Sequence, residues 1–224
     1  MQKSEIAIPP LQLGGTLQVP SNARGLVLFA HGSGSSRFSL RNAAVAEALN
    51  QAGFGTLLLD LLTDSEEGDR SKVFDIPLLA ARLIDAVHWI DRQPALSKQP
   101  LGLFGASTGA AAALQVAAEL GVTVKAVVSR GGRPDLAGAS LAQVRSPTLL
   151  IVGGDDDVVL ELNRQALEDL TCQKAIRIIP GATHLFPEPG AMDAVSSYAR
   201  DWFGLHLRGP AEDGYAEQGR SVPK

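Results

Sequence analysis

The central residues of the chain place a serine between two glycines, in the pentapeptide GASTG at residues 105–109. It matches the pattern G-x-S-x-G of a nucleophile elbow, a tight turn from a strand into a helix that exposes a reactive serine. The apolar stretch LGLF precedes the turn and the alanine-rich stretch AAAALQVAAEL follows it, as this motif requires. The start of a helix supplies N–H groups that stabilise an oxyanion. The pattern predicts acyl transfer with Ser107 as nucleophile and the Thr108 N–H as an oxyanion donor.

A serine hydroxyl is a weak nucleophile and needs a base, which a third group orients. Of the four histidines, His184 follows a predicted strand in a loop and is the predicted base. His88 falls inside an amphipathic helix, and His206 falls near a helix end, where a favourable dipole interaction explains it. The orienting acid is one of the consecutive aspartates 155–157, because the loop that carries them can reach the imidazole from behind.

The stretch AHGSGSS at residues 30–36 is the expected second half of an oxyanion hole. Small residues let the backbone approach a substrate carbonyl, and the Ser33 N–H is the predicted donor. His31 is expected to shape the turn, and with Gly32 to lie beside the substrate. The stretch lacks the lysine of G-x-x-x-x-G-K-[ST] and the spacing of G-x-G-x-x-G, which argues against a phosphate-binding loop.

All of these residues follow short apolar runs that alternate with segments of helical period. This alternation predicts a mostly parallel sheet with helices on both faces, and a ligand site beyond the carboxyl ends of its strands. A hairpin over residues 6–19, broken at Gly14 and Gly15, is expected at the sheet edge. The expected strands cover residues 25–30, 55–60, 101–105, 124–129, 148–152 and 175–179, and the expected helices 40–51, 76–92, 108–120, 135–144, 158–170 and 191–207.

Length and composition narrow the class of protein. The 224 residues predict a single domain over residues 1–207 and a polar, flexible tail over 208–224. The single cysteine, Cys172, excludes a disulfide scaffold, and the net charge of −4 argues against a nucleic-acid surface. The sequence shows neither a signal peptide nor a membrane span. We therefore expect a soluble, cytoplasmic protein with neither a metal nor an organic cofactor, and the oligomeric state stays open.

Five stretches together resemble the dienelactone hydrolase-like branch of the α/β-hydrolases: HGSGSS, GASTG, VSRGGRPDLAG, LLIVGGDDDVV and IPGATHLF. The resemblance covers residues 25–207 and implies the α/β-hydrolase fold, whose catalytic residues follow the chain order Ser, Asp, His. The family places its acid in a G-x-x-D-x-x-V pattern, which falls on Asp156, with Asp157 as the alternative. The chain also resembles stand-alone relatives of hydrolase domains that are fused to phosphoribosyltransferases.

The resemblance departs from dienelactone hydrolases at the nucleophile, because they carry a cysteine where this chain has Ser107. Cys172, expected late in a helix, cannot replace it. This difference favours a small-molecule ester as substrate. Residues 130–147 leave no room for a cap domain, which favours small, soluble acyl esters.

Arg130, at a strand end, could bind a substrate carboxylate, or it could pair with Asp135. The charged loop over residues 61–74 is expected to be solvated, although Leu61, Leu62 and Phe74 could form a wall of the acyl pocket.

The predicted function is hydrolysis of small carboxylic esters through an acyl-enzyme on Ser107. Two alternatives use the same residues. One is a ligand receptor on the hydrolase fold with slow turnover or none, which stoichiometric acylation without release would favour. The other is an acyltransferase or lactone hydrolase, which differs only in what attacks the acyl-enzyme.

Overall fold

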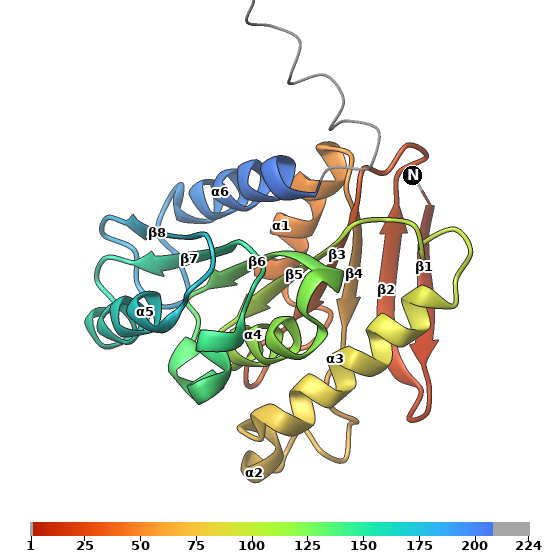
Figure 1. The fold of residues 1–224 in the computed structure, drawn as a ribbon, viewed down its shortest axis with the longest axis horizontal. Coiled ribbons are helices and arrows are strands. Elements are labelled where there is room, and N and C mark those ends of the chain that lie inside the picture. The colour runs from red at the N-terminus through yellow and green to blue at the C-terminus, as the bar shows by residue number, and fades with distance from the viewer. Residues whose placement is uncertain (1, 208–224) are drawn as a thin grey trace, which may run out of the picture.

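The computed structural model describes residues 2–207, and the predicted tail lies outside them. Its centre is an eight-stranded sheet in the order β1-β2-β4-β3-β5-β6-β7-β8 (Figure 1). Strands β3 to β8 are parallel, and β1 and β2 form an antiparallel hairpin at one edge. The bounds are β1 (Gln2–Ile8), β2 (Leu13–Val19), β3 (Leu26–Ala30), β4 (Gly55–Leu59), β5 (Leu101–Ala106), β6 (Val124–Arg130), β7 (Thr148–Gly153) and β8 (Lys174–Ile179).

Helices cover both faces of this sheet (Figure 1). Helices α1 (Leu40–Gln51) and α6 (Ala191–His206) pack together on one face, with the buried side chains of one apolar cluster beneath them. The other face carries α3 (Ile76–Asp91), α4 (Thr108–Leu120), the 3-10 segment η2 (Pro134–Gln143) and α5 (Asp157–Asp169). Two short elements, α2 (Arg70–Val73) and η1 (Gly121–Thr123), complete the connections. The predicted α/β-hydrolase architecture is confirmed.

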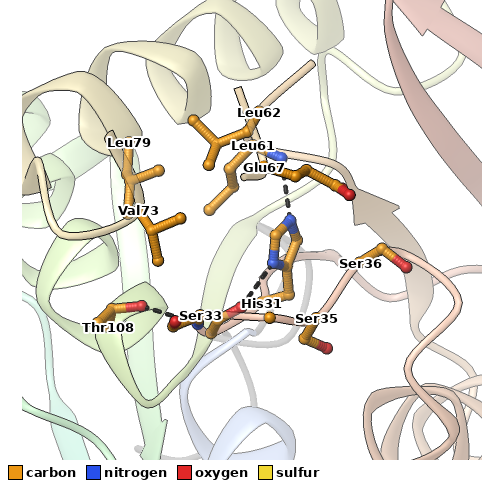
Figure 2. A pocket seen from close by; sticks show the side chains of 12 residues that line it. His31, Ser33, Ser35, Ser36, Leu61, Leu62, Glu67, Val73, Leu79 and Thr108 are labelled. Carbon is orange, nitrogen blue, oxygen red and sulfur yellow. Dashed lines mark hydrogen bonds between the residues drawn. The ribbon is translucent and has the colours of Figure 1, made fainter. Parts of the chain in front are cut away.

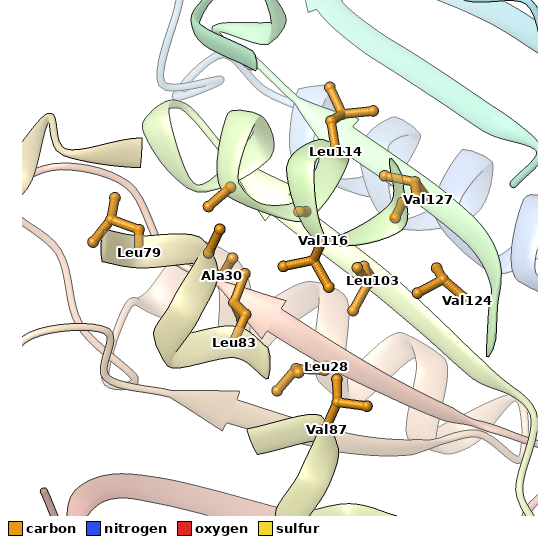
Figure 3. Packing of buried hydrophobic residues seen from close by; sticks show 14 of the residues in the cluster. Leu28, Ala30, Leu79, Leu83, Val87, Leu103, Leu114, Val116, Val124 and Val127 are labelled. Atoms are coloured by element: carbon orange, nitrogen blue, oxygen red, sulfur yellow. The ribbon is translucent and has the colours of Figure 1, made fainter. Parts of the chain in front are cut away.

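Helix α4 lies at the centre of its face, between α3 and η2. The four alanines at 110–113 are fully buried, and their small side chains let α4 lie close to β3, β5 and β6. Figure 3 shows the packing of this face: Leu79, Leu83 and Val87 recur along one side of α3 and meet side chains of the sheet and of α4. This rigid packing fixes the start of α4, where Ser107 lies.

Three expectations about local structure are wrong. The hairpin turns at residues 9–12, and Gly14 and Gly15 lie inside β2, where the Ile6 side chain would crowd a Cβ on Gly15. The segment expected as a helix over 135–144 is a 3-10 segment that Gly138 breaks at a φ of 53°. Cys172 lies beyond the end of α5, next to Thr148 at the amino end of β7.

No cap domain is present in the described part of the chain between β6 and β7, which holds only η2. In the described residues, no domain inserted between β6 and β7 therefore covers the carboxyl ends of the strands. This is the edge of the sheet where the sequence places the reactive residues.

Candidate active site

Ser107 occupies the turn between β5 and α4 with a φ of 52° and a ψ of −122°. A positive φ is unfavourable for serine, so the surrounding structure must hold it. The two flanking glycines allow the turn. A Cβ on Gly105 would lie 2.3 Å from the Ala110 Cα, and one on Gly109 would lie 2.4 Å from the carbonyl oxygens of Ala30 and His31. Larger residues at either position would therefore push α4 away from the sheet.

The loop after β6 holds the strained serine from both sides. The Ser107 N–H donates to the Arg130 carbonyl at 3.3 Å, and the Arg133 N–H donates to the Ser107 carbonyl at 3.1 Å. Both backbone polar groups of Ser107 are thus bonded to residues at and just after the end of β6. The position of Ser107 is set by the fold of β6 as well as by its own turn.

Asp156 and His184 are joined by a hydrogen bond of 2.7 Å between Oδ2 and Nδ1. Asp156 precedes α5 at its N-cap position, but its side chain makes no capping bond to the helix and is directed to the imidazole instead. A carboxylate only accepts hydrogen bonds, so Nδ1 carries the hydrogen and the lone pair of Nε2 is left to act as a base. Asp157 is the first residue of α5 and is exposed.

The end of β6 also contacts the histidine. A Cβ on Gly131 would lie 3.1 Å from the His184 carbonyl oxygen and 3.7 Å from its Cε1, so the imidazole lies against the loop that holds Ser107. Within the described residues no hydrogen bond joins the Ser107 hydroxyl to Nε2 of His184. In free enzymes such contacts are often long and tighten only in the complex with substrate.

The loop that carries His184 is held by Glu188. Its Oε1 accepts the Thr183 N–H at 3.1 Å and the Thr183 hydroxyl at 2.6 Å, and these bonds lower the pKa of Glu188. Two residues beyond His184, Phe186 is buried with a positive φ of 55°. This loop is therefore another strained segment at the site.

His31 is buried beneath the candidate oxyanion loop. Its Nε2 accepts the Leu61 N–H at 3.0 Å, and its Nδ1 lies 2.9 Å from the Gly32 carbonyl oxygen, so Nδ1 carries the hydrogen. Burial lowers the pKa of His31 and favours this neutral form. The imidazole thereby links the loop after β3 to the loop after β4. Gly32 lies directly against Ser107, since a Cβ here would be 2.8 Å from the Ser107 Cβ.

The two predicted oxyanion residues contact each other. The Ser33 N–H donates to the Thr108 hydroxyl oxygen at 3.1 Å, as the dashed line in Figure 2 shows. Thr108 is 2% exposed and Ser33 is exposed. The N–H expected to face a substrate is thus engaged by a side chain of the site, a contact that the sequence did not indicate.

A cavity of about 220 Å³ opens beside these two residues (Figure 2). Its apolar wall includes Leu61 and Leu62, which the sequence indicated, but Val73 of α2 lines it where Phe74 was the candidate; Phe74 is 44% exposed. The charged loop is largely exposed, as expected, and its exposed Glu67 also lines the cavity. The lining residues are His31, Gly32, Ser33, Gly34, Ser35, Ser36, Leu61, Leu62, Glu67, Val73, Leu79 and Thr108.

Arg130 lies on the other side of Ser107, under the His184 loop. It is 6% exposed, its Nη2 lies 3.4 Å from the Asn42 Oδ1, and its guanidinium lies 5.8 Å from the centre of the Phe186 ring. Burial and the charge of Arg41 lower the pKa of Arg130 to about 10. The alternative partner, Asp135, pairs with Arg133 instead. Among the described residues no carboxylate forms an ion pair with Arg130.

Within residues 2–207 no three His, Cys, Asp or Glu side chains gather where a metal ion could be held. None of the helices there has the length and apolar character needed to cross a membrane.

The parallel sheet, the strained serine after β5 and the acid and histidine after β7 and β8 define an α/β-hydrolase. Residues 13–203 match the model of the dienelactone hydrolase family, to which the chain belongs. Family and fold together mark the chain as a hydrolase.

Two relatives share more than half of their aligned residues with this chain. A dienelactone hydrolase from Anabaena variabilis, solved by crystallography, is 53% identical in sequence to this chain. The two structures match with a TM-score of 0.89 over 93% of this chain and 100% of that one. A Mycobacterium tuberculosis protein named "Putative phosphoribosyl transferase MT0597" is 56% identical over 95% of this chain. The chain spans 48% of that relative's length, so the activity in its name belongs to a longer protein.

More distant solved structures share the fold. A Xanthomonas campestris protein described as an α/β serine hydrolase without a lid is 18% identical, with a TM-score of 0.74 over 92% of this chain and 95% of that one. Est1E from Butyrivibrio proteoclasticus, solved with ferulic acid bound, is 17% identical, with a TM-score of 0.77 over 91% of this chain and 99% of that one.

Proposed function

We propose that this protein is a serine esterase that hydrolyses small carboxylic esters through an acyl-enzyme on Ser107. The observation that carries the proposal is the 2.7 Å bond from Asp156 to His184, at the same sheet edge as the strained Ser107. A carboxylate that holds an imidazole in one tautomer, at the same sheet edge as a serine in a tight turn, is the arrangement that activates a hydroxyl for acyl transfer.

In the proposed reaction, Nε2 of His184 takes the Ser107 proton as Oγ attacks the ester carbonyl. The charge that develops on the carbonyl oxygen falls beside the start of α4, where the Thr108 N–H and the positive end of the helix dipole stabilise it. His184 then returns the proton to the leaving alcohol. Water, activated by the same imidazole, hydrolyses the acyl-enzyme.

The exposure of the two proton-transfer residues fits these roles. The Asp156 side chain is 15% exposed and the His184 side chain is 38% exposed. The acid is shielded, which strengthens its bond to the imidazole, while the base stays open to substrate and water. The site can therefore exchange alcohol and water without a moving lid.

The size of the cavity beside Ser33 and Thr108 favours substrates with a small acyl group. Its volume of about 220 Å³ lies below the usual range of drug-sized pockets, and its apolar wall is formed by leucine and valine side chains. Acetyl and butyryl groups fit such a space better than an octanoyl chain. The proposed substrates are short, soluble esters.

The test is steady-state hydrolysis of p-nitrophenyl acetate, butyrate and octanoate near pH 8. We expect turnover that falls with acyl length and that Ser107→Ala lowers by roughly 10³-fold or more, with its unfolding transition unchanged. Cys172→Ser is the matched control, because Cys172 lies at the amino end of β7, away from the site. Retention of more than about a tenth of the activity by Ser107→Ala would overturn the proposal.

A further inference from the structure

The Thr108 side chain is placed to act in the reaction as well as its backbone. Thr108 is the first residue of α4, directly after the nucleophile, and its side chain lines the cavity beside Ser33. Figure 2 shows the Thr108 hydroxyl directed to the Ser33 backbone. The hydroxyl therefore belongs to the residue that follows the proposed nucleophile, and it lies beside the cavity proposed for the acyl group.

The hydrogen-bonding capacity of this hydroxyl is only half used. Its oxygen accepts the Ser33 N–H at 3.1 Å. A hydroxyl can also donate one hydrogen. Within the described residues that hydrogen has no acceptor, and because Thr108 begins α4, no preceding helical turn offers a carbonyl to it. Thr108 as a residue is 2% exposed and its side chain lines the cavity, so a ligand in the cavity is the group that can accept this hydrogen.

The contact from Ser33 prepares the hydroxyl to donate. It fixes the position of the oxygen, and a hydroxyl that accepts a hydrogen bond becomes a stronger donor, because bonds in a chain polarise one another. The Ser33 N–H can then act on an oxyanion through the Thr108 hydroxyl, without breaking the bond that it already makes.

We propose that the Thr108 hydroxyl is an oxyanion donor in acyl transfer at Ser107, acting beside the Thr108 N–H and held in place by the Ser33 N–H. The proton stays on Thr108 throughout, since the hydroxyl only donates a hydrogen bond to the charged oxygen. This inference rests on the proposed esterase function. It assigns the Ser33 N–H an indirect role in the oxyanion hole.

The experiment compares Thr108→Val with Thr108→Ser. Valine keeps the branched shape and removes the hydroxyl, whereas serine keeps the hydroxyl and removes the methyl group. We expect Thr108→Val to lower kcat for p-nitrophenyl acetate by about 10²-fold with little change in KM. Thr108→Ser should stay within a few-fold of wild type. The rate of Ser107 labelling by a fluorophosphonate should fall in parallel, because its phosphoryl oxygen enters the same hole.

Three results would overturn the inference. Thr108→Val with wild-type or higher kcat would mean that the hydroxyl only occupies the Ser33 N–H. Equal losses in both variants would trace the effect to the methyl group. A wild-type protein that neither turns over esters nor reacts with the fluorophosphonate would overturn the proposed function, and this inference with it. Thermal unfolding of both variants separates a loss of chemistry from a loss of structure, and Thr108→Ala replaces a variant that does not fold.

Discussion

The two sides of Ser107 differ in how much of the chemistry is assembled in advance. On one side, the loops after β7 and β8 have already brought Asp156 and His184 to 2.7 Å. On the other side, the loop after β3 directs the Ser33 N–H to Thr108, 3.1 Å away, and not to an open space. On the proton-transfer side the bond between Asp156 and His184 is made before substrate arrives, whereas the charge-binding side still holds an internal hydrogen bond.

This difference follows from what each side must do. An imidazole needs one fixed tautomer, and a carboxylate that accepts from Nδ1 supplies it permanently. An oxyanion forms only during the reaction, so its donors must be held in position until then. The contact between Ser33 and Thr108 holds the Thr108 hydroxyl in this way, and it is made entirely within the site.

The largest loss of activity is expected from a substitution on the proton-transfer side. Asp156→Asn keeps the shape of the side chain but can donate to Nδ1, which favours the wrong imidazole tautomer. We expect kcat for p-nitrophenyl acetate to fall by about 10³- to 10⁴-fold. Asp157→Asn is the control, because Asp157 is exposed at the start of α5, and it should stay within about twofold, as surface substitutions usually do. Equal losses in both variants would contradict the assignment of Asp156.

The next effect concerns Arg130, which lies under the same side and forms no ion pair with the described residues. If a substrate carboxylate binds its guanidinium, Arg130→Gln should raise KM by about tenfold for an ester that carries a carboxylate. KM for neutral p-nitrophenyl butyrate should stay unchanged. A rise in KM for both esters would show that Arg130 only supports the Phe186 loop.

A pH effect tests the charge-binding side. Because burial lowers the pKa of His31, the folded protein favours its neutral form. The unfolded chain then binds more protons below its ordinary pKa of about 6.5, so this contribution to stability is present above that pH and is lost as the pH falls below it. Chemical unfolding of wild type between pH 7 and 5 should show this loss. His31→Gln, which can still accept the Leu61 N–H, should show less of it, and equal slopes would exclude His31 as the source.

The smallest loss of activity is expected from a substitution that makes the His184 loop more mobile but leaves Asp156 and His184 unchanged. Thr183→Val removes the hydroxyl that donates to Glu188 at 2.6 Å and leaves the Thr183 N–H bond in place. The loop of His184 should become more mobile, and kcat should fall by only about two- to fivefold, the size expected for one exposed hydrogen bond. Hydrogen exchange of the loop amides measures the mobility directly. Unchanged exchange together with unchanged kcat would show that the backbone bond alone holds the loop.

The sequence predicts most of the fold because its strongest signals are local. The bounds of α1 and α4 match the prediction, and a glycine with a positive φ follows each helix, Gly53 after α1 and Gly121 after α4. Helix α2 was missed because it has four residues and depends on Asp69, whose side chain accepts the Ser71 N–H at its start. The 3-10 geometry of η2 was missed because Gly138 gives no signal of its own within a helical pattern.

The candidate site likewise has a part that the sequence indicated and a part that it did not. Chain order and motif spacing indicated Ser107 and His184, and the resemblance singled out Asp156, the residue that bonds the imidazole. The contact between Ser33 and Thr108 joins residues 75 positions apart and depends on one side-chain rotamer, so no sequence pattern reports it. The hydrogen bonds between Ser107 and the residues Arg130 and Arg133 join backbone groups only, so the residue types in the sequence could not predict them.

The open sheet edge above β6 and β7 has a consequence for the choice of acyl acceptor. With only η2 between these strands, no inserted domain separates the acyl-enzyme from bulk solvent. Water at its full concentration competes with every other acceptor, so a second alcohol or amine would win only if the walls of the site bound it. A search for transfer products should therefore begin with alcohols and amines supplied at concentrations high enough to compete with water.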